Sequence, residues 1–223
     1  MARTKRPLTR DAIVDAALAL VDEGGLEALS MRAIGSRLGV QAMSLYHHVP
    51  SKAALLDALH ERLILSIELG SFDGEWTDVL HSLAHAYRAV ALAHPQSFVL
   101  LATRPLATPA AIAHVAPLLD VLAAPGFGVR QRLLIMNIFF TALNGILLAE
   151  VAPVPGHSDV PEPDTEAVYR ELRDAGDGAT VGGADLVEFI DRDVNKLSIA
   201  AWFDEAIELI LHGLRTMVPD PAD

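Results

Sequence analysis

The sequence predicts an all-α protein: an N-terminal three-helix helix-turn-helix domain, a linking helix and a larger helical domain. Helical periodicity recurs along the chain, and no convincing alternating strand pattern appears. A short segment after a glycine turn, "QAMSLYHHV", is polar where a helix normally has residues to bury. The first ten residues carry four basic groups and no acid, in a chain of 223 residues with a net charge of −12.

Capping residues predict where the first two helices begin and end. Thr9 is a good N-cap for the first helix, and the glycines of "EGG" predict its end. The second helix is expected to open at Ser30 and stop at Gly39. The apolar faces of the two helices are Ile13, Ala17, Leu20 and Val21 in the first, and Ile34 and Leu38 in the second.

The third and fourth helices follow without a long connection. The third is the segment 41–49, which Pro50 interrupts. Ser51 caps the fourth, which we expect to end near Gly70 with an apolar face of Leu55, Leu56, Leu59 and Leu63. These helices predict a helix-turn-helix domain at 1–50, a connecting helix at 51–70 and a helical effector-binding and dimerisation domain at 71–223.

The remaining chain also has a helical pattern. We expect helices near 75–93, 95–103, 108–124, 128–150 and 200–217. The segment 151–183 is rich in Pro, Gly and Asp, and we expect a loop there with a helix at 164–174, and another helix near 184–197.

Composition excludes several classes of protein. The chain has no cysteine, so disulfide frameworks, thiolate zinc sites and cysteine nucleophiles are excluded. No apolar segment follows the basic N-terminus, so we expect no secretory signal and a cytoplasmic location. The apolar segment 133–152 contains Asn137, Asn144 and Glu150, which are costly in lipid, so we expect a helix buried in protein and no membrane partner.

Dividing the charge along the chain favours a nucleic-acid partner. Residues 1–64 hold eight Lys and Arg against seven Asp and Glu, whereas residues 65–223 hold nine against twenty-two. The acidic excess therefore belongs to residues 65–223. This asymmetry indicates a DNA-binding N-terminal part followed by an acidic C-terminal part. The alternative is a solvated basic tail.

The composition of the third helix fits contact with DNA. In a helix-turn-helix the second helix lies in the major groove, so its outer face must be polar. Gln41 and Ser44 can hydrogen-bond bases, and Ala42 and Met43 can touch thymine methyl groups. The side chains that suit phosphates are Tyr46, His48 and Lys52. A generic helical pair with a glycine turn and solvated histidines is the alternative interpretation.

The segments "GVQAMSLYHHVPSKAALLDAL" and "ALSMRAIGSRLG" closely resemble the DNA-binding domain of the tetracycline-repressor (TetR) family, over roughly residues 8–65. The resemblance implies an all-helical homodimer that binds a double-stranded DNA operator and carries a C-terminal ligand domain. Ala42, Met43 and His47 fall at the family's variable positions. The DNA-facing set that it implies is Arg32, Gln41, Ala42, Met43, Ser44, Tyr46, His47, His48 and Lys52.

The C-terminal part resembles that of the tetracycline repressor, after which the family is named, through Arg104-Pro105 and the helix that ends near Glu150. Two departures stand out: Leu100 replaces a metal-binding histidine, and a drug-contacting histidine is replaced at or near Glu68. We therefore expect a more apolar effector than magnesium-tetracycline. The candidate ligand-binding residues are Phe98, Leu101, Arg104, Met136, Phe139, Phe140 and Asn144.

The helical pattern also predicts a dimer surface and brings two histidines onto one face of a helix. Segments 128–150 and 200–217 are expected to form the dimer seam as a four-helix bundle, with a stripe of Phe203, Ile207, Ile210, Leu211 and Leu214. His81 and His85 are four residues apart and suit a metal ion, but no third ligand is evident, so we expect no metal site and no cofactor.

The function expected from the sequence is a one-component transcriptional regulator, a repressor released from a palindromic operator by a small, largely apolar effector. The alternative is a DNA-binding regulator that has no small ligand and is controlled by a protein partner. We expect no enzyme, because the sequence has no Gly-x-Ser-x-Gly, Walker or His-Glu-x-x-His motif.

Overall fold

The computed structural model describes residues 7–151, 170–171 and 199–219. The chain divides into two compact units, residues 1–152 with 207–223 and residues 153–206. All regular structure in the described residues is helical, which confirms the predicted fold class. The loop and helices expected within 152–198 lie outside the described residues, apart from 170–171, which are helical.

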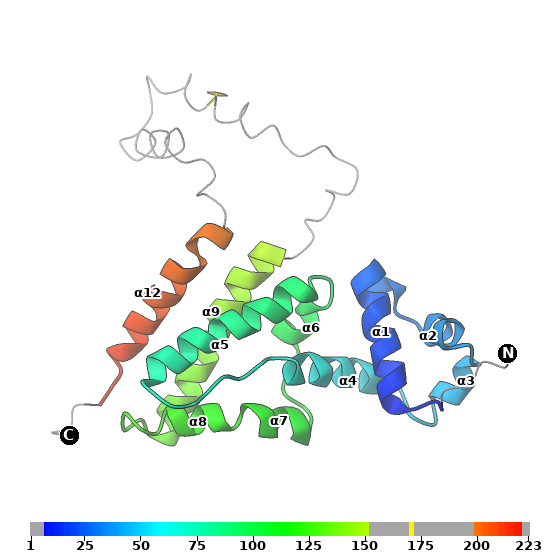
Figure 1. Ribbon diagram of the computed structural model, residues 1–223, viewed down its shortest axis with the longest axis horizontal. Helices are drawn as coiled ribbons and strands as arrows, with labels where there is room; N and C mark the ends of the chain where they lie inside the picture. The colour runs from blue at the N-terminus through cyan, green and yellow to red at the C-terminus, as the bar shows by residue number, and fades with distance from the viewer. Residues whose placement is uncertain (1–6, 152–169, 172–198, 220–223) are drawn as a thin grey trace. The chain divides into compact units, whose positions relative to one another are not determined.

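Three helices form the N-terminal group of the first unit: α1 (Arg10–Gly24), α2 (Met31–Leu38) and α3 (Ala42–Leu45), with a short 3-10 turn, η1 (Leu26–Ala28), after α1 (Figure 1). The hydroxyl of Thr9 accepts from Ala12 N at 3.1 Å, and that of Ser30 accepts from Ala33 N at 3.1 Å. Both predicted N-caps are therefore confirmed, and each stabilises its helix by about 1 kcal/mol.

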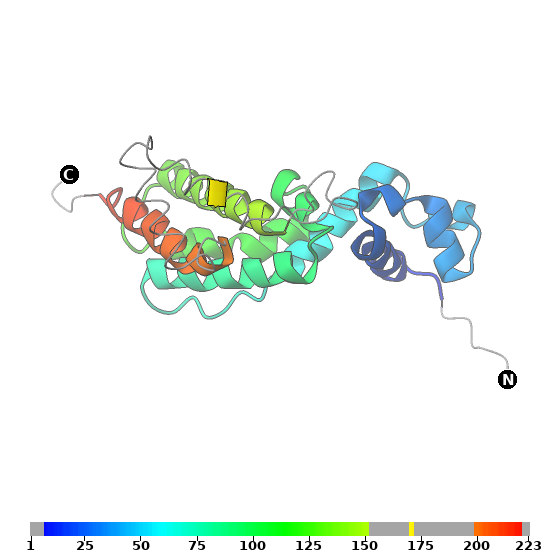
Figure 2. The same ribbon diagram turned by 90° about the horizontal axis from the view of Figure 1, so that it is seen from above.

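The linking helix α4 (Lys52–Leu65) runs from the N-terminal group toward the later helices (Figures 1 and 2). The hydroxyl of Ser51 caps it by accepting from Ala54 N at 3.1 Å. The helix ends before the predicted Gly70, because the Ser66 hydroxyl donates to Leu63 O at 2.7 Å and so competes for the carbonyls of the last turn.

The body of the first unit follows as α5 (Trp76–Ala93), α6 (Phe98–Thr103), α7 (Pro109–Val115), α8 (Pro117–Val121) and α9 (Val129–Val151). The single helix predicted at 108–124 is two helices, because Pro117 lacks an amide hydrogen and its ring opposes a continuous helix. α4 packs against α1, α6 and α7, and α9 packs against α5, α6 and α8.

α9 buries only one side within the chain. Its buried residues Ile135, Phe139, Leu143 and Leu147 recur every four positions. Leu134 and Ile138 remain 41% and 40% exposed on another side. Among the described residues, α9 is the one helix long and apolar enough to cross a membrane by length and composition, with 22% of that window buried. The expectation of a helix buried in protein is therefore met on one side of α9 only, within this chain.

α12 (Phe203–Arg215) follows a 3-10 turn, η4 (Ile199–Trp202). Its residues Ile207, Leu211 and Leu214 are buried within the chain, at 0%, 1% and 4% exposure. The prediction that Leu211 and Leu214 lie in the dimer seam is wrong, because both are buried within the chain's own core. Their hydrophobic stripe has the same periodicity whether it faces the chain's own core or a partner, so the pattern alone did not distinguish the two.

Candidate functional site

The turn between α2 and α3 depends on two glycines. Gly39 caps α2 with φ +68° and ψ 33°, a left-handed conformation that glycine adopts without steric cost. Gly35 lies where the chain folds back, and a Cβ there would lie 2.8 Å from Val40 O. These glycines let α3 follow α2 closely, as a helix-turn-helix requires.

α3 is shorter than the predicted segment 41–49. It spans Ala42–Leu45, and the amides of His48 and Val49 both donate to Leu45 O, at 3.0 and 2.9 Å. Pro50 disfavours the helical conformation for Val49, so the helix does not continue past this point. Leu45 and Val49 are buried at 0% and 2% exposure, so they anchor this element while its other side chains project outward.

Most of the nine side chains expected to face DNA are accessible. Ala42 and Ser44 are half-buried. The exposed ones are Arg32, Gln41, Met43, Tyr46, His47, His48 and Lys52. Met43 is 72% exposed, which for a methionine indicates a contact surface rather than core packing. Eight of the nine lie in α3, directly beside it in the chain, or at the start of α4, whereas Arg32 lies in the first turn of α2.

Ion pairs hold α1 against its neighbours. Arg37 of α2 donates two hydrogen bonds to Glu23, both at 2.7 Å, and this pairing lowers the pKa of the Glu23 carboxyl. Arg62 of α4 pairs with Asp15 and with Asp11, the latter at 3.2 Å. Because the pairs are exposed, we expect them to orient the helices more than to stabilise them.

A cavity of about 510 Å³ lies among α4, α5, α6, α7, α8 and α9. Most of its wall is aliphatic or aromatic, including Ile64, Leu83, Leu118 and Phe140. Such a volume suits a small organic molecule, and an apolar wall with few polar groups is typical of ligand sites.

The polar groups of the cavity come from four helices. Asn144 of α9 accepts from the Tyr87 hydroxyl at 2.7 Å and donates to Ala102 O at 3.3 Å. Burial raises the pKa of the Tyr87 hydroxyl, so this group stays protonated. Arg104 donates from its terminal nitrogen to Asp57 of α4, and its buried Nε has no partner among the described residues.

His60 of α4 is a buried polar residue in the cavity wall, at 3% exposure. Burial first, and then the charge of Arg104, lower the pKa of its imidazole, although Asp57 opposes the shift. The neutral imidazole has one donor and one acceptor to offer a ligand.

Five of the seven candidate ligand-binding residues line the cavity: Leu101, Arg104, Met136, Phe140 and Asn144. Phe98 and Phe139 do not, because they are fully buried behind the wall, where Phe98 contacts the Tyr87 ring and Phe139 the Phe140 ring. His60 and Tyr87 also line the cavity but were not among the predicted residues. A histidine one turn after Leu56, on a helix otherwise apolar at that spacing, was the available signal for His60.

Comparison with known proteins decides the family. Residues 13–59 match the family described as bacterial regulatory proteins, tetR family. Residues 71–218 match the tetracyclin repressor-like C-terminal domain. The chain belongs to the TetR family. Members of this family are transcriptional regulators that bind operator DNA as dimers and bind small-molecule ligands.

Curated relatives agree with this TetR assignment. An HTH-type transcriptional regulator of Saccharopolyspora erythraea is 41% identical over 127 residues, which cover 56% of this chain and 54% of that protein. The HTH-type transcriptional repressor DrrR1 of Streptomyces coeruleorubidus is 36% identical over 126 residues, 55% of this chain and 46% of that protein. The matches thus span about half the length of these relatives.

The likeness to solved structures extends over more of the chain than the curated matches do. The crystal structure of ActR of Streptomyces coelicolor in complex with actinorhodin covers 96% of this chain and 98% of its own, with a TM-score of 0.77 and 21% identity. At this identity the likeness supports the fold.

The structure places the two positions at which this TetR-family chain departs from the tetracycline repressor, Leu100 and Glu68. Leu100 is buried at 5% exposure and lies outside the cavity lining, and Glu68 is exposed. Glu150 accepts from Arg88 in a two-pronged pair, with N···O distances from 2.5 to 3.2 Å. Glu150 is therefore already neutralised by a residue of its own chain.

Proposed function

We propose that this protein is a homodimeric DNA-binding transcriptional repressor that a small, largely apolar effector releases from a palindromic operator. The observation that carries the proposal is a single helix, α4, with Lys52 beside the exposed face of α3 at one end and His60 and Ile64 in the cavity wall further along. In this proposal residues 1–50 bind DNA, 51–70 connect, and 71–223 bind effector and dimerise.

The DNA-binding roles follow from exposure and chemistry. We assign base contacts to Gln41, Ala42, Met43, Ser44 and His47, which the buried Leu45 and Val49 hold in place from behind. The phosphate contacts fall to Arg32, Tyr46, His48 and Lys52. Lys52 opens α4, whose first amides also favour an anion. The relative DrrR1 is named a repressor, which supports repression as the outcome of binding.

Dimerisation is assigned to the exposed apolar surface of α9 and α12. Leu134 and Ile138 lie one turn apart on α9, and Leu209 of α12 is 74% exposed. Large apolar side chains exposed on long helices mark an association surface. Family members act as dimers, and a two-fold axis would place two recognition helices about 34–36 Å apart, one turn of DNA.

The effector is assigned to the 510 Å³ cavity. Its wall favours an apolar molecule with one or two polar groups that meet His60, Arg104 or Asn144. Magnesium-tetracycline is not the expected effector, because Leu100 offers no metal ligand. The cavity also favours this proposal over regulation by a protein partner alone, which needs no internal volume. We place the protein in the cytoplasm, where operator DNA is found.

A DNA-binding experiment tests the proposal. The full chain should bind a palindrome in the DNA that flanks its own coding region, with two chains per site and an affinity at least ~10³-fold above that for unrelated DNA. A gel-shift titration with a scrambled palindrome as control measures this. Equal affinity for both sequences would contradict the proposal.

A further inference from the structure

The cavity among α4 to α9 has an apolar wall that contains a single positive charge. Among the described residues that line it, Arg104 has the one side chain that is charged at neutral pH, and none is an aspartate or a glutamate. The chain carries 29 Asp and Glu against 17 Lys and Arg, so this absence of acids does not follow from its composition. Because charges interact more strongly in apolar surroundings than in water, the wall favours an anionic group on the molecule that it encloses.

The counter-charge of Arg104 comes from outside the cavity lining. Asp57 of α4 accepts a hydrogen bond from one terminal nitrogen of Arg104, but Asp57 is not a lining residue. A guanidinium has five N–H donors in a planar fork, so this bond leaves donors for a second acceptor. The Nε of Arg104 is buried and has no partner among the described residues, which is costly for a polar group. An anion in the cavity would therefore meet an incompletely bonded cation.

The polar groups at another part of the wall bond to each other. The Tyr87 hydroxyl donates to Asn144 Oδ1 at 2.7 Å, and Asn144 Nδ2 donates to Ala102 O at 3.3 Å. Burial raises the pKa of the Tyr87 hydroxyl, so this group brings no charge to the cavity. The polar position of the wall that still needs an acceptor is thus Arg104.

His60 lies near Arg104 in the same wall. It follows Asp57 by three residues, so the two lie on the same side of α4. Burial first, and then the charge of Arg104, lower the pKa of the His60 imidazole, which places the imidazole within electrostatic reach of the guanidinium. A neutral imidazole can donate one N–H to an anion beside Arg104 without adding a second charge to the cavity.

We propose that the effector is a largely apolar organic acid whose anionic group accepts hydrogen bonds from Arg104 and His60. Its apolar part packs against Ile64, Leu118 and Phe140, in a cavity of about 510 Å³. A carboxylate or a sulfonate fits this site, because both present the paired acceptor oxygens that a guanidinium binds. This inference rests on the proposed role of the cavity as the effector site.

Two fluorescent probes with the same aromatic rings test the charge: anilinonaphthalene sulfonate, and phenylnaphthylamine, which lacks the sulfonate. Fluorescence titration of the full-length protein gives the Kd of each. Arg104→Gln should weaken the anionic probe by at least ~10-fold, as loss of a charge-assisted hydrogen bond predicts, and the neutral probe by less than ~2-fold. Asp57→Asn frees the guanidinium and should tighten the anionic probe, an effect that a purely structural role of Arg104 would not produce.

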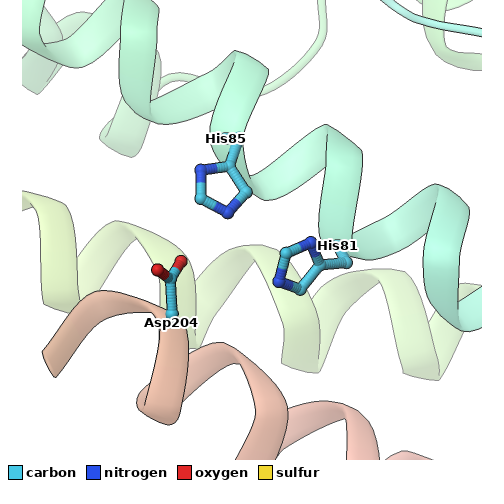
Figure 3. Close-up of side chains that lie close together, drawn as sticks. All are labelled: His81, His85 and Asp204. Atoms are coloured by element: carbon cyan, nitrogen blue, oxygen red, sulfur yellow. The ribbon is translucent and has the colours of Figure 1, made fainter.

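Each variant has a matched control outside the cavity lining. Arg132 also has a buried Nε with no partner among the described residues, and it donates to Leu119 O at 3.1 Å, but it does not line the cavity. Arg132→Gln should therefore leave both Kd values unchanged. His60→Gln should weaken the anionic probe by roughly 2–10-fold. Its control is His81→Gln, because His81 projects from α5 beside His85 and is not a lining residue (Figure 3).

The outcomes separate this inference from the proposed function. Phe140→Ala should weaken both probes, which locates them in the cavity. Equal losses of both probes in Arg104→Gln would overturn the acid, as would unchanged anionic binding, an Asp57→Asn variant without tighter binding, or an equal effect of Arg132→Gln; each leaves the cavity as a ligand site. Failure of both probes to bind the wild type would instead contradict the effector role of the cavity, and the acid with it. Circular dichroism checks that each variant folds.

Discussion

Arg104, at the end of α6, donates a hydrogen bond to Asp57 of α4. Arg104 lines the cavity, and Asp57 lies five residues after Lys52, where α4 begins beside the DNA-binding face. The guanidinium of Arg104 therefore lines the effector cavity and also bonds to α4, the helix that follows the recognition element in the chain. A ligand that competes for Arg104 would act directly on α4, and it releases DNA only if it binds the DNA-incompetent state better.

Breaking this pair should change stability in a non-additive way. Arg104→Gln and Asp57→Asn each remove the charge pair, so the double variant should cost less than the sum of the two singles. We expect a coupling of about 0.5–1 kcal/mol, since both side chains are partly exposed to solvent. Urea unfolding of the four proteins measures it. Strict additivity would mean that the pair is not formed in solution.

Lys52→Ala should weaken binding to all DNA sequences alike and reduce the slope of log K against log salt by roughly one. His47→Ala should instead alter base preference while leaving the salt dependence in place. Fluorescence anisotropy at several salt concentrations separates the two effects. Arg130→Ala is the control, because Arg130 is an exposed cation at the start of α9. A Lys52 variant with altered sequence preference and an intact salt slope would refute the phosphate assignment.

Ile138→Glu should dissociate the dimer, because it places an unpaired charge in an apolar seam. Leu92→Glu is the control: Leu92 is also an exposed aliphatic residue, at 53%, but lies on α5. Light scattering coupled to size exclusion should show folded monomers for the first variant and dimers for the second. A dimer that survives both Ile138→Glu and Leu209→Glu would place the seam elsewhere.

Phe140→Ala should weaken the binding of an apolar fluorescent probe such as anilinonaphthalene sulfonate by roughly 2–10-fold, as loss of one aromatic contact predicts. Phe72→Ala, at an exposed phenylalanine outside the cavity, is the control.

Tetracycline with magnesium should leave operator binding nearly unchanged. Full release at low drug concentration would show that the interpretation of Leu100 is mistaken.

His60 should make the protein less stable in mild acid. Its pKa is lowered in the folded state, chiefly by burial, so below its ordinary value of about 6.5 the unfolded chain binds more protons than the folded one. Stability is therefore fully present above that value and falls as pH drops through the lowered pKa. His60→Gln should lose less stability between pH 7.5 and 5.5 than the wild type, measured by urea unfolding. An identical pH dependence would contradict this.

The N-terminal group was predictable because its signals are local. Thr9, Ser30 and Ser51 are caps that act on amides three residues away, and Gly39 is required by its own backbone conformation. The cavity was less predictable, since it depends on which long-range neighbours α4 and α9 acquire. Hydrophobic periodicity identified the stripe of α12 but not its partner, and spacing along α4 gave no indication that Asp57 bonds to Arg104.

The residues that anchor α3 in the core are different from those that face outward, and this separation bears on how such proteins diversify. Leu45 and Val49 hold the element in place, whereas Gln41, Met43 and His47 contribute little to the core. Substitutions at the outward positions should therefore be nearly neutral for folding, within about ±0.5 kcal/mol, while they change which bases are contacted. After gene duplication, a copy of this chain can acquire a new operator without first gaining surplus stability, and so evolve a separate regulon by single steps.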